Sequence, residues 1–110
     1  ELLTKDKTMA MLHTVNKSPF DRSSLESCVR LAADGSSVLL TEDGVYGAMK
    51  GTQKSALVEK AMGKLNFYVL GPDVKARGIA DDKLIDGIKV VDYDGFVDLV
   101  TETDSAQSWL

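Results

Sequence analysis

Short β-rich runs alternate with amphipathic helical patterns along this 110-residue chain, and the alternation constrains the fold more than any other feature. Four runs have the character of strands, at residues 11–16, 37–42, 65–70 and 88–93. The second and third are nearly continuous apolar stretches, which is typical of parallel strands covered by helices on both faces. The sequence therefore predicts an α/β fold: a three-layer sandwich around a short, mainly parallel four-stranded sheet.

Helical patterns and turn residues fill the first two connections between these runs. Ser23 and Glu26 have the spacing of a capping box, and apolar residues follow at helical intervals until Gly35. In the second connection, Asp43 is expected to cap a short helical turn, and a longer helix is expected over residues 53–62. Both connections are therefore predicted to cross over the sheet as helices.

The C-terminal third is predicted to contain shorter elements. Residues 71–73 (Gly-Pro-Asp) indicate a turn followed by one helical turn, and residues 81–86 a further short helix. The last helix is expected to start near Asp94 and to bury Phe96, Val97 and Val100. Trp109 and Leu110 follow a polar stretch, and we expect them to dock onto the sheet edge or into a subunit interface.

Composition narrows the class of protein. Residues 1–10 show no periodicity, so we interpret them as a disordered leader or expression remnant and residues 11–110 as a single domain. No apolar stretch approaches the roughly 20 residues needed to span a membrane. The net charge is −4 and Lys/Arg residues do not cluster, which disfavours direct binding of nucleic acid. A single cysteine suits the reducing cytoplasm.

Several familiar catalytic and binding motifs are absent from the sequence. There is no G-x-G-x-x-G after the first strand, no Walker A sequence and no G-x-S-x-G elbow. One histidine, His13, and one cysteine, Cys28, cannot make a zinc site unless carboxylates or another chain contribute. We therefore expect no cofactor and no metal.

Cys28 is the candidate reactive group. It shares a helical stripe with Leu25 and Val29 that is predicted to face the core, where desolvation raises a thiol pKa. It also lies beyond the first helical turn, out of reach of the helix dipole. The sequence around Cys28 by itself favours a packing role for this residue. Activation of its thiol would need neighbours such as His13 or Lys17, or a partner subunit.

Charged residues at the carboxyl ends of the predicted strands are secondary candidates. Lys17, Glu42, Asp43 and Asp73 lie at the edge where open α/β sheets bind ligands, although turn and cap chemistry is the alternative and the better explanation for Asp43. Lys75 and Arg77 are either solvated loop charges or contacts for an acidic partner surface.

Five blocks of sequence resemble one family of small proteins. They are HTVNKSPF (13–20), LLTEDGVYGAM (39–49), YVLGPDVKARGI (68–79), VVDYDGFVDL (90–99) and the terminal SWL (108–110). Their order and spacing resemble the DsrH/TusB family of sulphur-relay subunits, from about residue 11 to residue 110. The resemblance implies a DsrE-like, flavodoxin-like fold.

The resemblance also implies partners and a pathway. Members of the family assemble with DsrE/TusD-like and DsrF/TusC-like subunits into a heterohexamer in the cytoplasm. The complex passes persulfide sulphur from a TusA-like donor to a DsrC/TusE-like acceptor, with no membrane and no direct nucleic acid contact. Cys28 matches a cysteine of DsrH-like members, which favours the branch that serves dissimilatory sulphur oxidation.

Two hypotheses follow from this resemblance, and a third stays open. In the first, Cys28 is a persulfide carrier in a DsrEFH-like complex. In the second, the chain is a TusB-like structural subunit, without chemistry of its own, of the complex that supplies sulphur for 2-thiolation of the tRNA wobble uridine. A stand-alone small-molecule binder of the same fold is the third.

Overall fold

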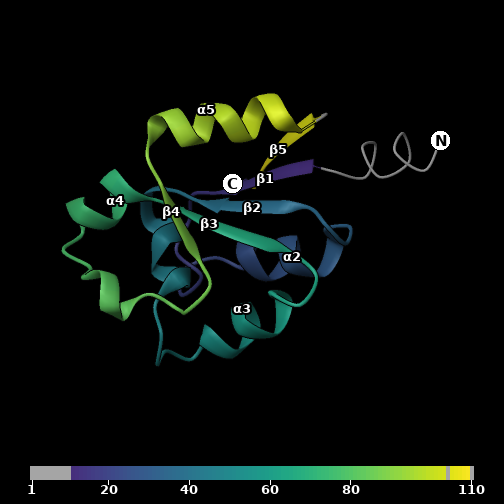
Figure 1. Ribbon diagram of the computed structural model, residues 1–110. Coiled ribbons are helices and arrows are strands. Elements are labelled where there is room, and N and C mark those ends of the chain that lie inside the picture. The colour runs from purple at the N-terminus through teal and green to yellow at the C-terminus, as the bar shows by residue number, and fades with distance from the viewer. Residues whose placement is uncertain (1–10, 104, 110) are drawn as a thin grey trace.

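A five-stranded parallel sheet with helices on both faces forms the body of the molecule (Figure 1). The computed structural model describes residues 11–103 and 105–109. The leader predicted at residues 1–10 and the docking of Leu110 lie outside the described residues. The three-layer α/β architecture predicted from the sequence is confirmed.

The strands of the sheet follow the order β4-β3-β2-β1-β5, and every neighbouring pair is parallel. They are β1 (Met11–Val15), β2 (Ser37–Leu40), β3 (Asn66–Leu70), β4 (Lys89–Val91) and β5 (Ser105–Trp109). Each of the four predicted runs contains a strand, but the prediction of a four-stranded sheet is wrong. The fifth strand, Ser-Ala-Gln-Ser-Trp, is an exposed edge strand without the apolar signal of a buried one.

Six helical segments connect the strands. They are α2 (Ser24–Leu31), the 3₁₀ helix η1 (Glu42–Ala48), α3 (Ser55–Ala61), α4 (Gly71–Ala76), the 3₁₀ helix η2 (Asp81–Lys83) and α5 (Tyr93–Glu102). Within the described residues, no helix combines the length and the apolar character that crossing a membrane requires.

Two of the predicted helix caps are wrong. Ser23 does occupy the N-cap position of α2, but at φ −91° and ψ 14° it departs from the extended conformation, and its side chain makes no cap hydrogen bond. Asp43 lies inside η1, behind Thr41, and its carboxylate pairs with Arg77 instead. The cap that does form is Asp92, whose Oδ1 accepts a 2.8 Å hydrogen bond from the backbone N–H of Gly95 at the start of α5.

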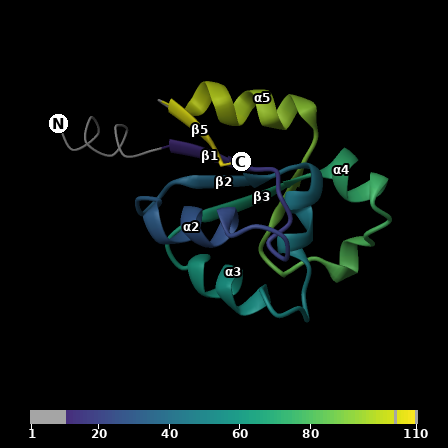
Figure 2. The same cartoon turned by 180° about the vertical axis from the view of Figure 1, so that it is seen from behind.

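The direction of the chain decides which helix covers which face. From β1 to β4 the chain moves steadily toward one edge of the sheet, and it then returns past β1 to place β5 at the other edge. Because crossovers between parallel strands are right-handed, reversing direction places the last connecting helix on the opposite face. In both views α5 accordingly covers one face alone, whereas α2 and α3 lie across the other (Figures 1 and 2).

The two faces bury very different numbers of apolar residues. On the side of α2 and α3, eighteen buried residues form one cluster, whereas the side of α5 contains a cluster of only Leu12, Leu39 and Leu99. Phe96 is half-buried there, but Val97 and Val100 are 56% and 44% exposed, so their predicted burial is wrong. A single helix spans too little of the sheet for its outer residues to reach the core.

Candidate functional site

Cys28 lies on the inner side of α2, inside the larger apolar cluster. Its residue surface is completely buried, and Leu25 and Val29 beside it on the helix are buried too. Burial raises the pKa of the Cys28 thiol to about 12, because the thiolate would lose its hydration without gaining a counter-charge. At pH 7 the thiol is therefore almost entirely protonated.

The two side chains proposed as activators of Cys28 do not serve it in this structure. Lys17 is exposed. His13 is buried in β1, but its Nδ1 accepts a 3.1 Å hydrogen bond from Trp109 Nε1, and its Nε2 has no partner among the described residues. A thiol without a cation or a base is poorly suited to accept sulphur, because the thiolate is the nucleophile.

The contact between His13 and Trp109 joins the first strand to the last. The indole N–H donates to Nδ1, so the neutral imidazole carries its proton on Nε2. Burial lowers the pKa of His13, because a charged imidazolium would be desolvated. Trp109 is the last described residue of β5, the strand at the edge of the sheet beside β1. The predicted docking of Trp109 at the sheet edge is therefore confirmed.

A hollow of about 380 Å³ opens at the carboxyl ends of the central strands. It lies where the chain reverses direction between β1 and β5, the position at which open α/β sheets bind ligands. Its lining comes from β1, the loop after β2, the start of α4, the start of α5 and β5: Thr14, Asn16, Thr41, Glu42, Leu70, Asp73, Tyr93, Phe96 and Ser108.

Two of the predicted edge residues meet at this hollow. The backbone N–H of Glu42 donates a 2.7 Å hydrogen bond to Asp73 Oδ2. Glu42 has a φ of 48°, in the left-handed region that non-glycine residues rarely adopt, so the contact with Asp73 helps to hold a strained loop. Both residues therefore have a clear structural task. Cys28 is not among the lining residues.

The next pair of charges is also used within the fold. Arg77 Nε lies 3.0 Å from Asp43 Oδ1, and its Nη1 donates to the backbone carbonyl of Asp73. These contacts tie α4 to η1. Lys75 is exposed on α4 beside a second hollow.

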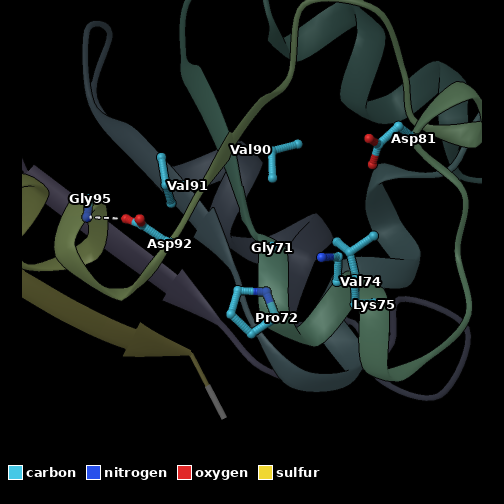
Figure 3. A pocket seen from close by; sticks show the side chains of 9 residues that line it. All are labelled: Gly71, Pro72, Val74, Lys75, Asp81, Val90, Val91, Asp92 and Gly95. Atoms are coloured by element: carbon cyan, nitrogen blue, oxygen red, sulfur yellow. Dashed lines mark hydrogen bonds between the residues drawn. The ribbon is translucent and has the colours of Figure 1, made fainter.

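The second hollow, of about 690 Å³, lies between α4, β4 and the start of α5 (Figure 3). Apolar side chains make up most of its wall, including Pro72, Val74, Val90 and Val91. Asp81, Asp92 and Lys75 also line it. The sequence analysis missed this feature, because a strand signal at residues 88–93 does not show that β4 is the outermost strand of the sheet.

Neither hollow resembles a redox or metal centre. Among the residues the structure describes, no three His, Cys, Asp or Glu side chains come together as a metal-binding group. Cys28 lines neither hollow, so the site predicted at Cys28 and the hollows at the sheet edge are separate.

Comparison with known proteins identifies close sequence relatives. The model of the family described as "DsrH like protein" matches residues 17–106. Protein TusB of Erwinia tasmaniensis is 37% identical over 99 residues, covering 90% of this chain and all of that protein. Protein TusB of Escherichia coli K12 is 32% identical over 99 residues, with the same coverage.

Solved structures show where the fold recurs. The ychN protein of Escherichia coli superimposes with a TM-score of 0.75 at 17% identity, covering 90% of this chain and 97% of that one. The protein MTH1491 of Methanobacterium thermoautotrophicum, described as being of unknown function, gives a TM-score of 0.75 at 21% identity over the same shares. These likenesses support the α/β fold alone, whereas the sequence matches extend over nearly the whole chain. The chain belongs to the DsrH/TusB family.

Proposed function

We propose that this chain is a TusB-like structural subunit of a sulphur-relay complex that supplies sulphur for 2-thiolation of the tRNA wobble uridine. It assembles with TusC/DsrF-like and TusD/DsrE-like subunits into a heterohexamer in the cytoplasm. Residues 11–110 form the single domain that takes part in this assembly. A TusA-like donor passes persulfide sulphur to a sister subunit, and that subunit passes it on to a TusE-like acceptor. The chain itself shapes the complex and carries no sulphur.

The burial of Cys28 is the observation that carries this proposal. A persulfide carrier has to meet two other proteins in turn, so its sulphur must be accessible, but Cys28 exposes no surface. Its raised pKa suppresses the thiolate further. An added sulphur atom on Sγ would also have to displace core side chains, and overpacking a dense core costs about 1–3 kcal/mol.

The names of the curated relatives favour the thiolation pathway over sulphur oxidation. The relatives that match over 90% of this chain at 31–37% identity are named TusB. Family resemblance links the Tus branch to 2-thiouridine. The dissimilatory pathway has no comparable support from the relatives, so we place it second.

A reconstituted complex tests the proposal directly. The chain is purified with its TusC-like and TusD-like subunits, treated with a persulfidated TusA-like donor, and the intact mass of each subunit is measured. We expect added sulphur on the TusD-like subunit and none on this chain. Cys28→Ala should transfer sulphur to the acceptor at the rate of the unchanged complex. Sulphur on Cys28, or loss of transfer in Cys28→Ala, would overturn a purely structural role.

The persulfide-carrier hypothesis keeps one observation in its favour, which is the position of Cys28 itself. The cysteine matches one that DsrH-like members carry in the first helix of the fold. For Cys28 to act, α2 would have to move and expose the thiol in the assembled complex. Labelling of Cys28 with iodoacetamide in the intact complex, faster than in the isolated chain, would support this second function.

A cellular measurement separates the two pathways. In cells that lack this chain, we expect digested tRNA to lose 2-thiouridine, and expression of Cys28→Ala to restore it. Unchanged 2-thiouridine in such cells would exclude the thiolation pathway, and an accompanying defect in oxidation of stored sulphur would favour the DsrEFH-like alternative.

A further inference from the structure

Large apolar side chains gather on the outer surface of the α5 side. Within the described residues, six large apolar side chains are exposed, and three of these belong to α5. These three are Tyr93 (59% exposed), Val97 (56%) and Val100 (44%). We refer to them as the α5 surface. Exposed apolar residues of monomers are normally scattered singly, whereas a contiguous set marks an interaction site.

The hollow of about 690 Å³ is separate from this surface. Val90, which lines the hollow, pairs with Val69 and so points to the face of the sheet that α2 and α3 cover, whereas Val91 packs on the side of α5. On α5 itself, Tyr93, Val97 and Val100 follow each other at intervals of four and three residues, so they form one apolar ridge along the helix. Such a ridge can provide the anchoring contacts of a protein interface.

The charge around this surface is strongly negative. Residues 81–102 contain seven carboxylates and two lysines, a net charge of −5, whereas the whole chain has a net charge of −4. Three of the carboxylates, Asp94, Asp98 and Glu102, follow each other at four-residue intervals on α5. They have no ion-pair partner in the described part of the chain.

Apart from Asp94, which lies in the first turn and suits the helix dipole, this row of carboxylates does not stabilise α5. Like charges four residues apart destabilise a helix by about 0.2–0.5 kcal/mol per pair. Glu102 also lies in the last turn, where the helix dipole disfavours an anion, and that turn contains no basic residue. The carboxylates therefore suit a positively charged partner better than the isolated helix.

We propose that the α5 surface forms a docking site for a sister subunit of the relay complex. The partner packs apolar side chains against Tyr93, Val97 and Val100 and surrounds them with lysine or arginine side chains that face the carboxylates of α5. This inference rests on the proposed function as a complex subunit. The same carboxylates repel nucleic acid and anionic lipid, which leaves a protein as the occupant.

The fold gives the partner a clear position. In the described part of the chain, α5 alone covers this side of the sheet, with the buried residues Leu12 and Leu39 beneath it and Leu99 on it, and β4 is an open edge. A subunit docked along α5 would therefore supply the missing apolar cover on this side. The opposite face already has α2 and α3 as its cover.

Binding of the full chain to the purified pair of sister subunits tests the proposal by calorimetry. We expect Val97→Arg to weaken binding by roughly 30-fold or more, because it places a cation against the basic rim and removes apolar contact. The double variant Asp94→Asn/Asp98→Asn should weaken binding by about tenfold and reduce its dependence on salt. Val97→Ala, which retains the helix, should give a smaller loss in the same direction.

Leu31→Arg is the matched control, because Leu31 is 66% exposed on α2, across the sheet from α5. We expect its affinity to stay within about twofold of the unchanged chain. For the charge variant, Glu26→Gln/Glu59→Gln removes two exposed carboxylates from α2 and α3 and should leave the salt dependence unchanged. Circular dichroism and thermal unfolding confirm that each variant is folded.

Three outcomes would overturn the proposal in different ways. Normal binding by Val97→Arg and Val97→Ala would place the interface elsewhere while leaving the proposed function intact. Failure of the unchanged chain to bind the sister pair would remove the proposed function, and the docking site with it. Self-association of the isolated chain that Val97→Arg abolishes would identify a second copy as the occupant instead.

Discussion

The two faces of the sheet differ in how completely this chain can bury them by itself. On one face, α2, α3 and η1 enclose a large apolar cluster that also contains Cys28. On the other, α5 lies alone over Leu12 and Leu39 and contributes the buried Leu99, and its outer side exposes Tyr93 and Val97. The first face is covered as a protein core normally is, whereas the second leaves apolar side chains exposed, as a subunit interface does before its partner binds.

Cys28 and the outer residues of α5 therefore differ in whether other proteins can reach them. A thiol in the covered core is protected from solvent and from other proteins, so its chemistry is suppressed by the same packing that stabilises the fold. The exposed apolar residues of α5 contribute little to the stability of the isolated chain, because they retain contact with water. Stability and function would thus reside on different sides of one sheet.

The largest expected effect compares the two cores. We expect Leu25→Ala, in the core on the α2 side, to lower the free energy of unfolding by about 3–5 kcal/mol, since Leu25 is completely buried. Leu99→Ala, on α5, should lower it by about 2 kcal/mol, because fewer neighbours surround the cavity. Urea unfolding measures both. Equal losses would contradict the contrast between the faces.

The second prediction concerns the close packing of η1 against β1. A Cβ at Gly44 would collide with the backbone carbonyl oxygen of Val15. Because backbone has to move, we expect Gly44→Ala to lower the free energy of unfolding by about 2–4 kcal/mol. Gly63→Ala is the control, since the nearest atom to its Cβ would be 3.6 Å away, and it should change stability by less than about 1 kcal/mol. Unchanged urea midpoints for both variants would refute this packing.

The third prediction sharpens the interpretation of Cys28. Cys28→Ser should lower the free energy of unfolding by about 1–3 kcal/mol, because a buried hydroxyl needs a hydrogen-bond partner that the apolar cluster does not offer. Cys28→Ala should lower it by about 1 kcal/mol. In the unchanged chain, labelling of the thiol should occur only as fast as the protein opens. Rapid labelling of the folded chain would show that α2 does not seal this face.

The sequence predicted the layered fold because its main signals are local. Apolar runs identify β1 to β4, and the helical stripe around Leu25 identifies α2. β5 gave no such signal, since Ser105–Trp109 is a polar edge strand that pairs with β1 through backbone contacts 94 residues away in sequence. The exposure of Val97 and Val100 also depends on tertiary structure, because their helical spacing is the same whether or not a partner covers them.

The candidate site was predictable only in part. The helical stripe correctly indicated that Cys28 is buried, and strand ends correctly indicated that Glu42 and Asp73 meet at one edge. The capping box failed because the Ser23 backbone turns away from the conformation it needs. Nor could spacing anticipate that Asp43 would pair with Arg77, since the pair depends on how α4 packs against η1.

The smallest predicted effect is the pH dependence of stability that arises from His13, at the contact between β1 and β5. His13 is neutral in the folded chain because burial lowers its pKa, whereas in the unfolded chain it takes up a proton near pH 6.5. Its contribution to stability is therefore present above about pH 6.5 and decreases as the pH falls below that value.

Protonation would also break the hydrogen bond from Trp109, because imidazolium Nδ1 cannot accept one. Thermal unfolding between about pH 7.5 and pH 5.5 measures the effect, and Trp109 fluorescence reports the local change. This pH range includes the titration of histidine but lies above that of ordinary carboxylates. His13→Gln retains a hydrogen-bond acceptor without titrating, so its stability should be nearly flat over this range. Since the chain contains one histidine, an equal decline in His13→Gln would show that the pH dependence arises elsewhere, and that the contact between β1 and β5 does not contribute to it.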